Sequence, residues 1–271
     1  MNNSFLKRIN RAVLVSALLA LSQTVMAKPV VVIPSEKLIQ GYAVSYSPNG
    51  KLFATTGYNN TVTVWSTQTG KAKHILRGHT GSVYAVRFSP DGKTLVSGGA
   101  DSILIVWDAF TGKRMLTLRG HSGSVFMLDY HPDGAQIVSG SSDRSAIVWS
   151  STTGKTIYAL KQHTGSVDAV AFSPNGRYIA TGSSDSTAVI WNAKTGRPIQ
   201  TLKHHTGGIP GVSFSPDNRF LATGSTDDSV ILSDVTTGRL IRTLKGHSGD
   251  VFTVSFSPDG KQVASASQDM T

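Results

Sequence analysis

A repeat of 42 residues runs through most of the sequence and constrains its fold more than any other feature. Histidine, proline and tryptophan each recur at this interval, and the three series keep one register. The series are His79, His121, His163, His205 and His247; Pro48, Pro90, Pro132, Pro174, Pro216 and Pro258; and Trp65, Trp107, Trp149 and Trp191. A period of this length indicates a repeat protein, in which each supersecondary unit buries its apolar faces against its neighbours.

The second repeat shows what one unit contains. Its short runs mix apolar, β-branched and aromatic residues, and such runs predict strands. Between the first two runs, Ser89-Pro90-Asp91-Gly92 suits a tight turn, because proline presets φ and glycine tolerates the last position. The predicted strands are residues 82–88, 94–97, 103–107 and 115–119. Each repeat therefore predicts four antiparallel strands, and the chain is expected to be all-β.

The composition excludes several classes of protein. The 271 residues include no cysteine, which excludes a disulfide scaffold, a thiol nucleophile, a zinc finger and an iron–sulfur cluster. Hydrophobic residues make up 39% and charged residues 15% of the chain, a balance that predicts a packed core rather than disorder. The formal net charge of +10 comes from scattered Lys and Arg residues, so we expect a solvated surface and no nucleic-acid partner.

Residues 1–27 differ from the rest and predict a secretory signal peptide. Basic residues precede the apolar run at residues 12–21, and small residues precede a cleavage site after Ala27. The run is shorter than the roughly 18 to 20 residues that a membrane span needs, and no later stretch is apolar enough to span a bilayer. We therefore expect an exported protein, periplasmic or secreted, without a membrane span.

The repeated markers resemble those of a known family. Gly78-His79, Gly98 with Asp101 three residues later, and Trp107-Asp108 are similar to the markers of WD-repeat β-propellers, here of an exported bacterial type. The resemblance implies that residues 41–271 form four-stranded blades around a central channel. About six blades are expected, the last incomplete at Thr271, as in a fragment of a six- or seven-bladed ring. In the segment 28–40, residues 29–33 lie where the resemblance implies a ring-closing strand.

A set of His, Ser or Thr, Asp and Trp recurs in the repeats and resembles a catalytic triad in composition. An active site needs one asymmetric constellation, whereas this set appears in successive repeats. The resemblance implies a hydrogen-bonded network inside each blade, where an unpaired buried group would cost about 1–3 kcal/mol. The predicted network residues are His79, Ser97, Asp101 and Trp107; His121, Ser139, Asp143 and Trp149; and His163, Thr181, Asp185 and Trp191. The fifth repeat departs from the pattern, with Ser233 in place of tryptophan.

A second repeated position varies between repeats, as a binding position would. In the WD-repeat family, partners commonly meet the channel mouth through the residue after the first apolar residue of the innermost strand. These mouth residues are Tyr42, Tyr84, Phe126, Asp168, Pro210 and Phe252. Aromatic rings offer buried area at low entropic cost, and one carboxylate could hold a Lys or Arg of a partner. The alternative is that the rings only pack against neighbouring blades.

The sequence favours a non-enzymatic scaffold or adaptor that presents a propeller face to a protein or peptide partner. It contains no phosphate loop, nucleophile elbow or metal-ligand pattern, so no catalytic residue, cofactor or metal is expected. One alternative is a ligand- or cofactor-binding enzyme that uses the central channel, with Asp168 as its charged group. Another is the docking part of a longer sensor protein. The sequence predicts neither the partner's identity nor an oligomeric state.

Overall fold

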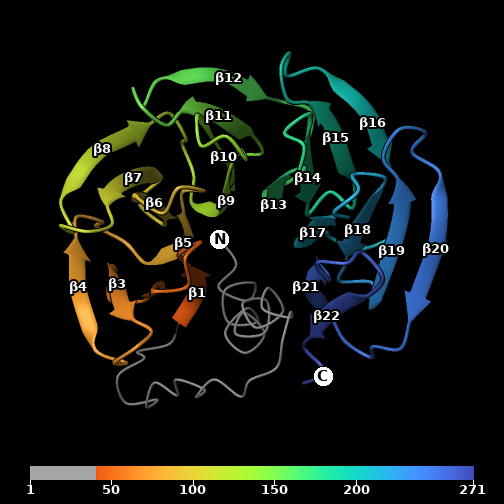
Figure 1. Cartoon of the computed structure of the whole chain (residues 1–271). Helices are drawn as coiled ribbons and strands as arrows, with labels where there is room; N and C mark the ends of the chain where they lie inside the picture. The colour runs from red at the N-terminus through yellow and green to blue at the C-terminus, as the bar shows by residue number, and fades with distance from the viewer. Residues whose placement is uncertain (1–40) are drawn as a thin grey trace.

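The computed structural model describes residues 41–271, which fold into 22 strands arranged as six antiparallel sheets (Figure 1). We number the sheets as blades 1 to 6 in chain order. Blade 1 contains β1 (Gly41–Tyr46), β2 (Leu52–Gly57), β3 (Thr61–Ser66) and β4 (Ala72–Arg77). Blade 2 contains β5 (Val83–Phe88), β6 (Thr94–Gly99), β7 (Ile103–Asp108) and β8 (Arg114–Arg119). Blade 3 contains β9 (Val125–Tyr130), β10 (Gln136–Ser141), β11 (Ala146–Ser150) and β12 (Thr156–Leu160).

The second half of the described chain repeats this order up to the last blade. Blade 4 contains β13 (Val167–Phe172), β14 (Tyr178–Ser183), β15 (Ala188–Asn192) and β16 (Pro198–Leu202). Blade 5 contains β17 (Gly211–Phe214), β18 (Phe220–Gly224), β19 (Ser229–Asp234) and β20 (Leu240–Lys245). Blade 6 contains only β21 (Val251–Phe256) and β22 (Val263–Ser267). The predicted all-β propeller of four-stranded blades with an incomplete last blade is therefore confirmed.

Local chemistry explains where the strands turn. In blade 2, the Ser89 hydroxyl donates to the Asp91 carboxylate at 2.7 Å and accepts the Thr94 N–H at 3.0 Å. Gly92 adopts a φ of 69° and donates its N–H to the Ser89 carbonyl at 2.9 Å. A side chain rarely adopts that φ, so glycine suits this position. The turn therefore connects β5 to β6 with its polar groups paired.

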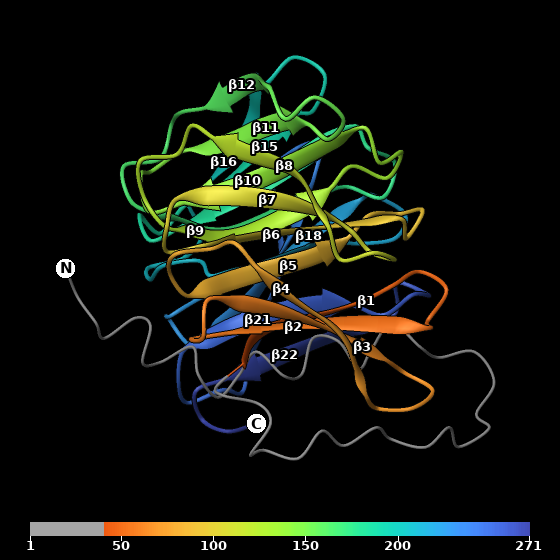
Figure 2. The ribbon, with the colours of Figure 1, turned by 90° about the vertical axis from the view of Figure 1, so that its left-hand side faces the viewer.

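The blades are arranged radially, with their first strands innermost. Strands β1, β5, β9, β13, β17 and β21 each pack against the next around the ring axis. Figure 2 shows the ring from the side, with the strands of the first three blades stacked beside one another. The apolar core lies between consecutive blades: one cluster joins Val64 of blade 1 to Trp107 of blade 2, and the next joins Val106 of blade 2 to Trp149 of blade 3. Each blade thus depends on its neighbours for burial.

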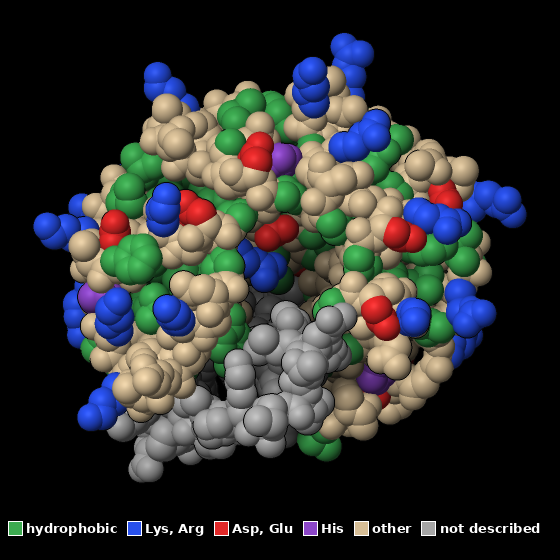
Figure 3. Space-filling model, in the orientation of Figure 1, with side chains coloured by type: hydrophobic (Ala, Val, Ile, Leu, Met, Phe, Trp, Pro, Cys, Tyr) green, Lys and Arg blue, Asp and Glu red, His purple; other side chains and the backbone are tan. Residues whose placement is uncertain are grey.

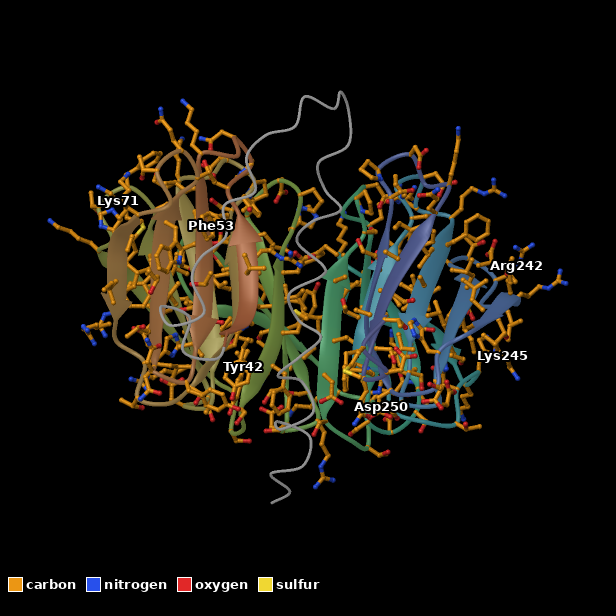
Figure 4. The ribbon with its side chains drawn as sticks, turned by 90° about the horizontal axis from the view of Figure 1, so that it is seen from below. Tyr42, Phe53, Lys71, Arg242, Lys245 and Asp250 are labelled. Atoms are coloured by element: carbon orange, nitrogen blue, oxygen red, sulfur yellow. The ribbon has the colours of Figure 1, made fainter. Side chains whose placement is uncertain are left out.

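The ring has one position where blades do not meet. Within residues 41–271, no contact between β21 and β1 is comparable to those between the other innermost strands. Figure 4 shows blade 1, which carries Phe53, facing the last blades across this position. The predicted signal peptide (residues 1–27) and the predicted ring-closing segment (residues 28–40) lie outside the described residues.

Candidate functional site

The repeated polar set forms a continuous chain of hydrogen bonds within blade 3. The Trp149 indole N–H donates to the Ser139 hydroxyl at 2.8 Å, and the same oxygen lies 2.8 Å from His121 Nε2. His121 Nδ1 in turn lies 2.8 Å from Asp143 Oδ2. The strands β10 and β11 bring Ser139 and Trp149 together, whereas the histidine arrives from the segment before β9. The chain of bonds therefore ties the blade's entry to its two central strands.

The same chain recurs around the ring with little change in geometry. In blades 2, 4, 5 and 6, the His–Asp distance is 2.9–3.0 Å and the distance from His Nε2 to the hydroxyl is 2.7–2.8 Å. The Trp107 and Trp191 indoles donate to the hydroxyls of Ser97 and Thr181, both at 2.9 Å. In blade 1, the Trp65 indole donates to Thr55 at 2.8 Å. The structure thus brings together all twelve residues predicted for the network.

The carboxylates of the network are held in the ionised form. Burial alone would raise the pKa of Asp185, but hydrogen bonds from Thr187 and from the Thr164 N–H, with the neighbouring His163, lower it to about 2. Similar hydrogen bonds from His121 and Ser145 hold the pKa of Asp143 well below its usual range. These acids therefore act at neutral pH as hydrogen-bond acceptors that fix the histidines.

The network hydroxyls are closed to any substrate. Ser97, Ser139 and Thr181 are each 0% exposed, and each already binds both a histidine and a tryptophan. A nucleophile must reach a reacting atom, and these oxygens have no open side. The arrangement stabilises the blades and offers no nucleophilic site.

The mouth residues occupy a special backbone position that the sequence did not reveal. Tyr84, Phe126, Asp168 and Phe252 are each the extra residue of a β-bulge near the start of an innermost strand. A bulge leaves one residue without a cross-strand partner and re-aims its side chain. Tyr42 lies at a similar irregularity, and Pro210, which lacks an N–H, immediately precedes β17. In Figure 4, Tyr42 of blade 1 and Asp250, just before β21, lie toward the same end of the ring.

Three of the aromatic mouth residues form one arc across blades 1 to 3. The ring of Tyr84 lies 4.9 Å from that of Tyr42 and 5.8 Å from that of Phe126, measured between centroids. Tyr58, from the loop after β2, stacks obliquely on Tyr42 at 4.5 Å. Tyr42 is buried, while Tyr84 and Phe126 are half-buried and keep part of their surface open. We refer to Tyr42, Tyr58, Tyr84 and Phe126 as the aromatic arc.

The remaining apolar mouth residues, Pro210 and Phe252, belong to blades 5 and 6. Phe252 is 7% exposed and packs with Ala266 of its own blade. Pro210 is buried. Neither forms a ring contact with the aromatic arc among the described residues. The six predicted residues therefore divide into three members of the aromatic arc, a carboxyl group at Asp168, and two buried side chains at Pro210 and Phe252.

Asp168 is unusual because it is a buried carboxyl group that has no hydrogen-bond partner among the described residues. It is 7% exposed, and within residues 41–271 its Oδ1 atom accepts no hydrogen bond. Burial, followed by the negative charge of Asp185, raises the pKa of Asp168 to about 8. Buried polar groups are nearly always paired, so within residues 41–271 this carboxyl group is an exception, as is the Ser233 hydroxyl.

The other carboxylate of the innermost strands shows how such a group is normally accommodated. Asp129 on β9 lies with its Oδ1 atom 3.3 Å from the Nε of Arg87, and its Oδ2 atom accepts the Phe172 N–H at 3.0 Å. Asp129 thus links blades 2, 3 and 4. The innermost strands therefore pair the half-buried carboxylate of Asp129, whereas Asp168 has no such partner within residues 41–271.

A search of known protein families agrees with this architecture. The model of the WD domain, G-beta repeat, matches residues 36–66, 70–108, 112–150, 154–192, 196–234 and 238–271. The chain belongs to the WD40 repeat family. WD40 repeats generally mediate protein–protein interaction, and their propellers are typically not enzymes. No curated protein matches the chain.

Two further findings concern the described residues. Residues 41–271 contain no helix of the length and apolar character needed to cross a membrane. In the same range, no three His, Cys, Asp or Glu side chains are grouped so that they could hold a metal ion.

Proposed function

We propose that the chain is a non-enzymatic adaptor that binds a protein or peptide partner at the mouth residues, with Asp168 receiving a Lys or Arg side chain of that partner. The unpartnered carboxyl group of Asp168 carries this proposal. The WD40 fold supports the general class of function, and the mouth residues supply the chemistry of recognition.

The physical basis is that a cation would supply what the buried acid lacks. A guanidinium or ammonium group beside Asp168 would favour its ionised form and pair its free oxygen. Phe126, at the equivalent position of the preceding blade, and Tyr84 beyond it keep part of their rings open. Aromatic faces attract cations and offer rigid apolar area. A basic residue flanked by apolar side chains therefore suits this end of the ring.

The test is selection of random peptides on the folded chain, followed by affinity measurement. We expect the selected peptides to share a Lys or Arg and an adjacent apolar residue. Asp168→Asn keeps the shape but removes the charge, and should weaken binding at least about tenfold, which corresponds to about 1.4 kcal/mol. Asp259→Asn removes a charge from the exposed turn between β21 and β22 and serves as the control. Equal affinity for the parent chain and Asp168→Asn would contradict the assignment.

Export of the chain is a separate part of the proposal and rests on residues 1–27 alone. The basic segment, the apolar run and the small residues before Lys28 are typical of a cleaved signal peptide. The partner would then be an extracytoplasmic protein. Expression in a bacterium followed by N-terminal sequencing of the periplasmic fraction should give a chain that begins at Lys28, and an intact N-terminus in the cytoplasm would oppose this.

Basic residues do not change this choice of partner. Figure 3 shows most Lys and Arg side chains projecting around the rim of one face, with another beside the central opening and with Asp and Glu side chains among them. Nucleic-acid sites usually concentrate positive charge in one stripe or patch. A protein or peptide therefore remains the partner that the mouth residues favour.

A further inference from the structure

An open pocket lies on blade 3, at a place that the mouth residues do not reach. It has a volume of about 660 Å³, and none of the six mouth residues lines it. Its walls come from the turn between β10 and β11, from the outer strand β12, and from the segments that follow β8 and β12. The lining residues used below are Ser122, Arg144, Thr156, Ala159, Lys161 and Gln162.

Three of these residues depart from the repeat, and all three departures shape the pocket. Arg144 stands where other repeats have a side chain without positive charge: Asn60, Ser102, Ser186, Asp228 and Met270. Ala159 stands where others have a β-branched residue: Ile75, Thr117, Thr201 and Thr243. Gln162 replaces a glycine found at Gly78, Gly120 and Gly246. Blade 3 has therefore gained a charge at Arg144, lost side-chain bulk at Ala159 and gained an amide side chain at Gln162.

The second cation of the pocket belongs to the regular pattern. Lys161 is equivalent to Arg77, Arg119, Lys203 and Lys245, so every complete blade has one cation at the end of its outer strand. Only blade 3 combines it with a cation in the turn between its two central strands, because Arg144 is the single basic residue at that position. Two positive charges thus line one pocket.

Neither cation is neutralised within the described residues. Arg144 and Lys161 form no ion pair there. The one carboxylate in the lining, Asp143, is already occupied: Oδ2 binds His121 and the Ser122 N–H, and Oδ1 accepts from the Ser145 N–H and hydroxyl. Both carboxylate oxygens of Asp143 are therefore occupied by hydrogen bonds within the blade, and neither forms an ion pair with Arg144 or Lys161.

Neutral donors complete the lining. Within residues 41–271, the hydroxyls of Ser122 and Thr156 make no hydrogen bond, so both can donate into the pocket. The Gln162 side-chain amide donates to the Thr201 hydroxyl at 2.7 Å and so fixes this wall to blade 4. The pocket thus offers a guanidinium, an ammonium and two hydroxyls, and all of them are free to donate.

We propose that this pocket binds a phosphate monoester group through Arg144 and Lys161. Two cations match the double negative charge of such a group, and a guanidinium can bind two of its oxygens at once. The free hydroxyls supply donors for the remaining oxygen, which a carboxylate does not have. The volume accommodates a small organic residue attached to the phosphate. This site is independent of the proposed partner site at the mouth.

The test is titration of the isotope-labelled chain with phosphoserine, inorganic phosphate and serine, followed by NMR at low ionic strength. We expect phosphoserine to shift the amide signals of residues 142–145 and 159–162, and serine to leave them unchanged. Binding of inorganic phosphate as tight as that of phosphoserine would identify free phosphate as the ligand. It would still support recognition of a phosphate group by Arg144 and Lys161. No shift with either phosphate compound would overturn the proposal.

Two variants separate a pocket from general surface charge, and both use residues that other repeats carry at the same place. Arg144→Ser should raise the Kd for phosphoserine at least about tenfold. Ala159→Thr keeps every charge but narrows the pocket, and should weaken phosphoserine binding while leaving the fold intact. Lys245→Ser removes the cation that blade 5 carries at the position equivalent to Lys161, away from the pocket, and should have no effect. Equal losses for Arg144→Ser and Lys245→Ser, or full binding by Ala159→Thr, would show a general attraction of anions to the charged surface and overturn the pocket.

Discussion

At the scale of single residues, buried hydroxyls show how the repeat uses polar groups. Ser139 and Ser233 are both 0% exposed, yet their surroundings differ. Ser139 binds His121 and Trp149, whereas the Ser233 hydroxyl has no hydrogen-bond partner within residues 41–271. Ser233 occupies the place of tryptophan, so blade 5 lacks the donor that completes the network in blades 2 to 4.

This contrast predicts opposite effects of one substitution. Ser139→Ala leaves an indole and an imidazole unpaired in the core, and should lower the free energy of unfolding by about 1–3 kcal/mol. Ser233→Ala removes a hydroxyl that has no partner, and should be neutral or stabilise by up to about 1 kcal/mol. Urea unfolding of both variants measures the difference. Similar losses for the two would show that Ser233 contributes a hydrogen bond that the structure does not contain.

Asp168 predicts a pH dependence whose sign follows from its surroundings. Burial raises the pKa of Asp168 to about 8, whereas an unfolded chain has the ordinary value of about 3.9. Between about pH 4 and pH 8 the folded state holds a proton that the unfolded state has lost, so Asp168 lowers stability as the pH rises through this window. Asp168→Asn should therefore be the more stable chain at neutral pH, by up to about 1.4 kcal/mol for each pH unit above 4.

Subtracting the unfolding free energy of the parent chain from that of Asp168→Asn cancels the contributions of the other titrating groups. The network carboxylates, including nearby Asp185, are present in both chains. The measurement is the unfolding free energy of each at several pH values. The difference should vanish near pH 4, and a difference that stays constant with pH would show that Asp168 is ionised in the folded chain.

At the scale of elements, the strands were predictable and their irregularities were not. The predicted strand at residues 103–107 is observed as β7 (Ile103–Asp108), because local β-propensity and the proline and glycine turns mark its limits. The bulge at Tyr84 depends on how β5 pairs with β6, and a strand's own sequence does not contain that register. The signal for the blade 3 pocket was present in the sequence, as departures at Arg144, Ala159 and Gln162, but only the fold shows that they converge.

The two-stranded last blade predicts uneven protection of the backbone. In blade 4, β14 pairs with β13 and β15 and is buried at all but its first residue. In blade 6, β22 pairs only with β21 within the described residues, and three of its residues are half-buried. Local opening requires less free energy where fewer contacts are lost. Hydrogen exchange followed by NMR should show the amides of β22 exchanging at least about 100-fold faster than those of β14. Equal protection would mean that another segment covers the free edge of β22.

At the scale of the whole molecule, stability follows from contacts between neighbouring blades. Blade 4 packs against β9 on one side and β17 on the other, whereas β21 of blade 6 packs against β17 and makes no comparable contact with β1 within residues 41–271. In a molecule built of repeats, the total stability is approximately a sum of blade and interface contributions. A destabilising substitution in blade 4 therefore weakens two interfaces between blades, whereas one in blade 6 weakens a single interface.

Two equivalent histidines allow this difference to be measured. His163 of blade 4 and His247 of blade 6 make the same pair of bonds, at 2.7 Å to a hydroxyl and 2.9–3.0 Å to a carboxylate. Their side chains are 1% and 18% exposed, respectively. His163→Ala should lower the free energy of unfolding by about 3 kcal/mol and the main Tm by roughly 6–12 °C. The reason is that it breaks the hydrogen-bond network of a blade that packs against a neighbour on each side. His247→Ala should leave the main transition nearly unchanged.

The effect of His247→Ala should instead appear locally, since β21 and β22 can open while blades 1 to 5 remain packed. Calorimetry would measure the main transition, and hydrogen exchange would measure the opening of β21 and β22 in the same variant. If both substitutions lowered the main Tm equally, blade 6 would be as fully coupled as blade 4, and the ring would unfold as one closed unit. Retention of the main transition in His247→Ala, with faster exchange confined to blade 6, would identify blade 6 as the place where unfolding begins.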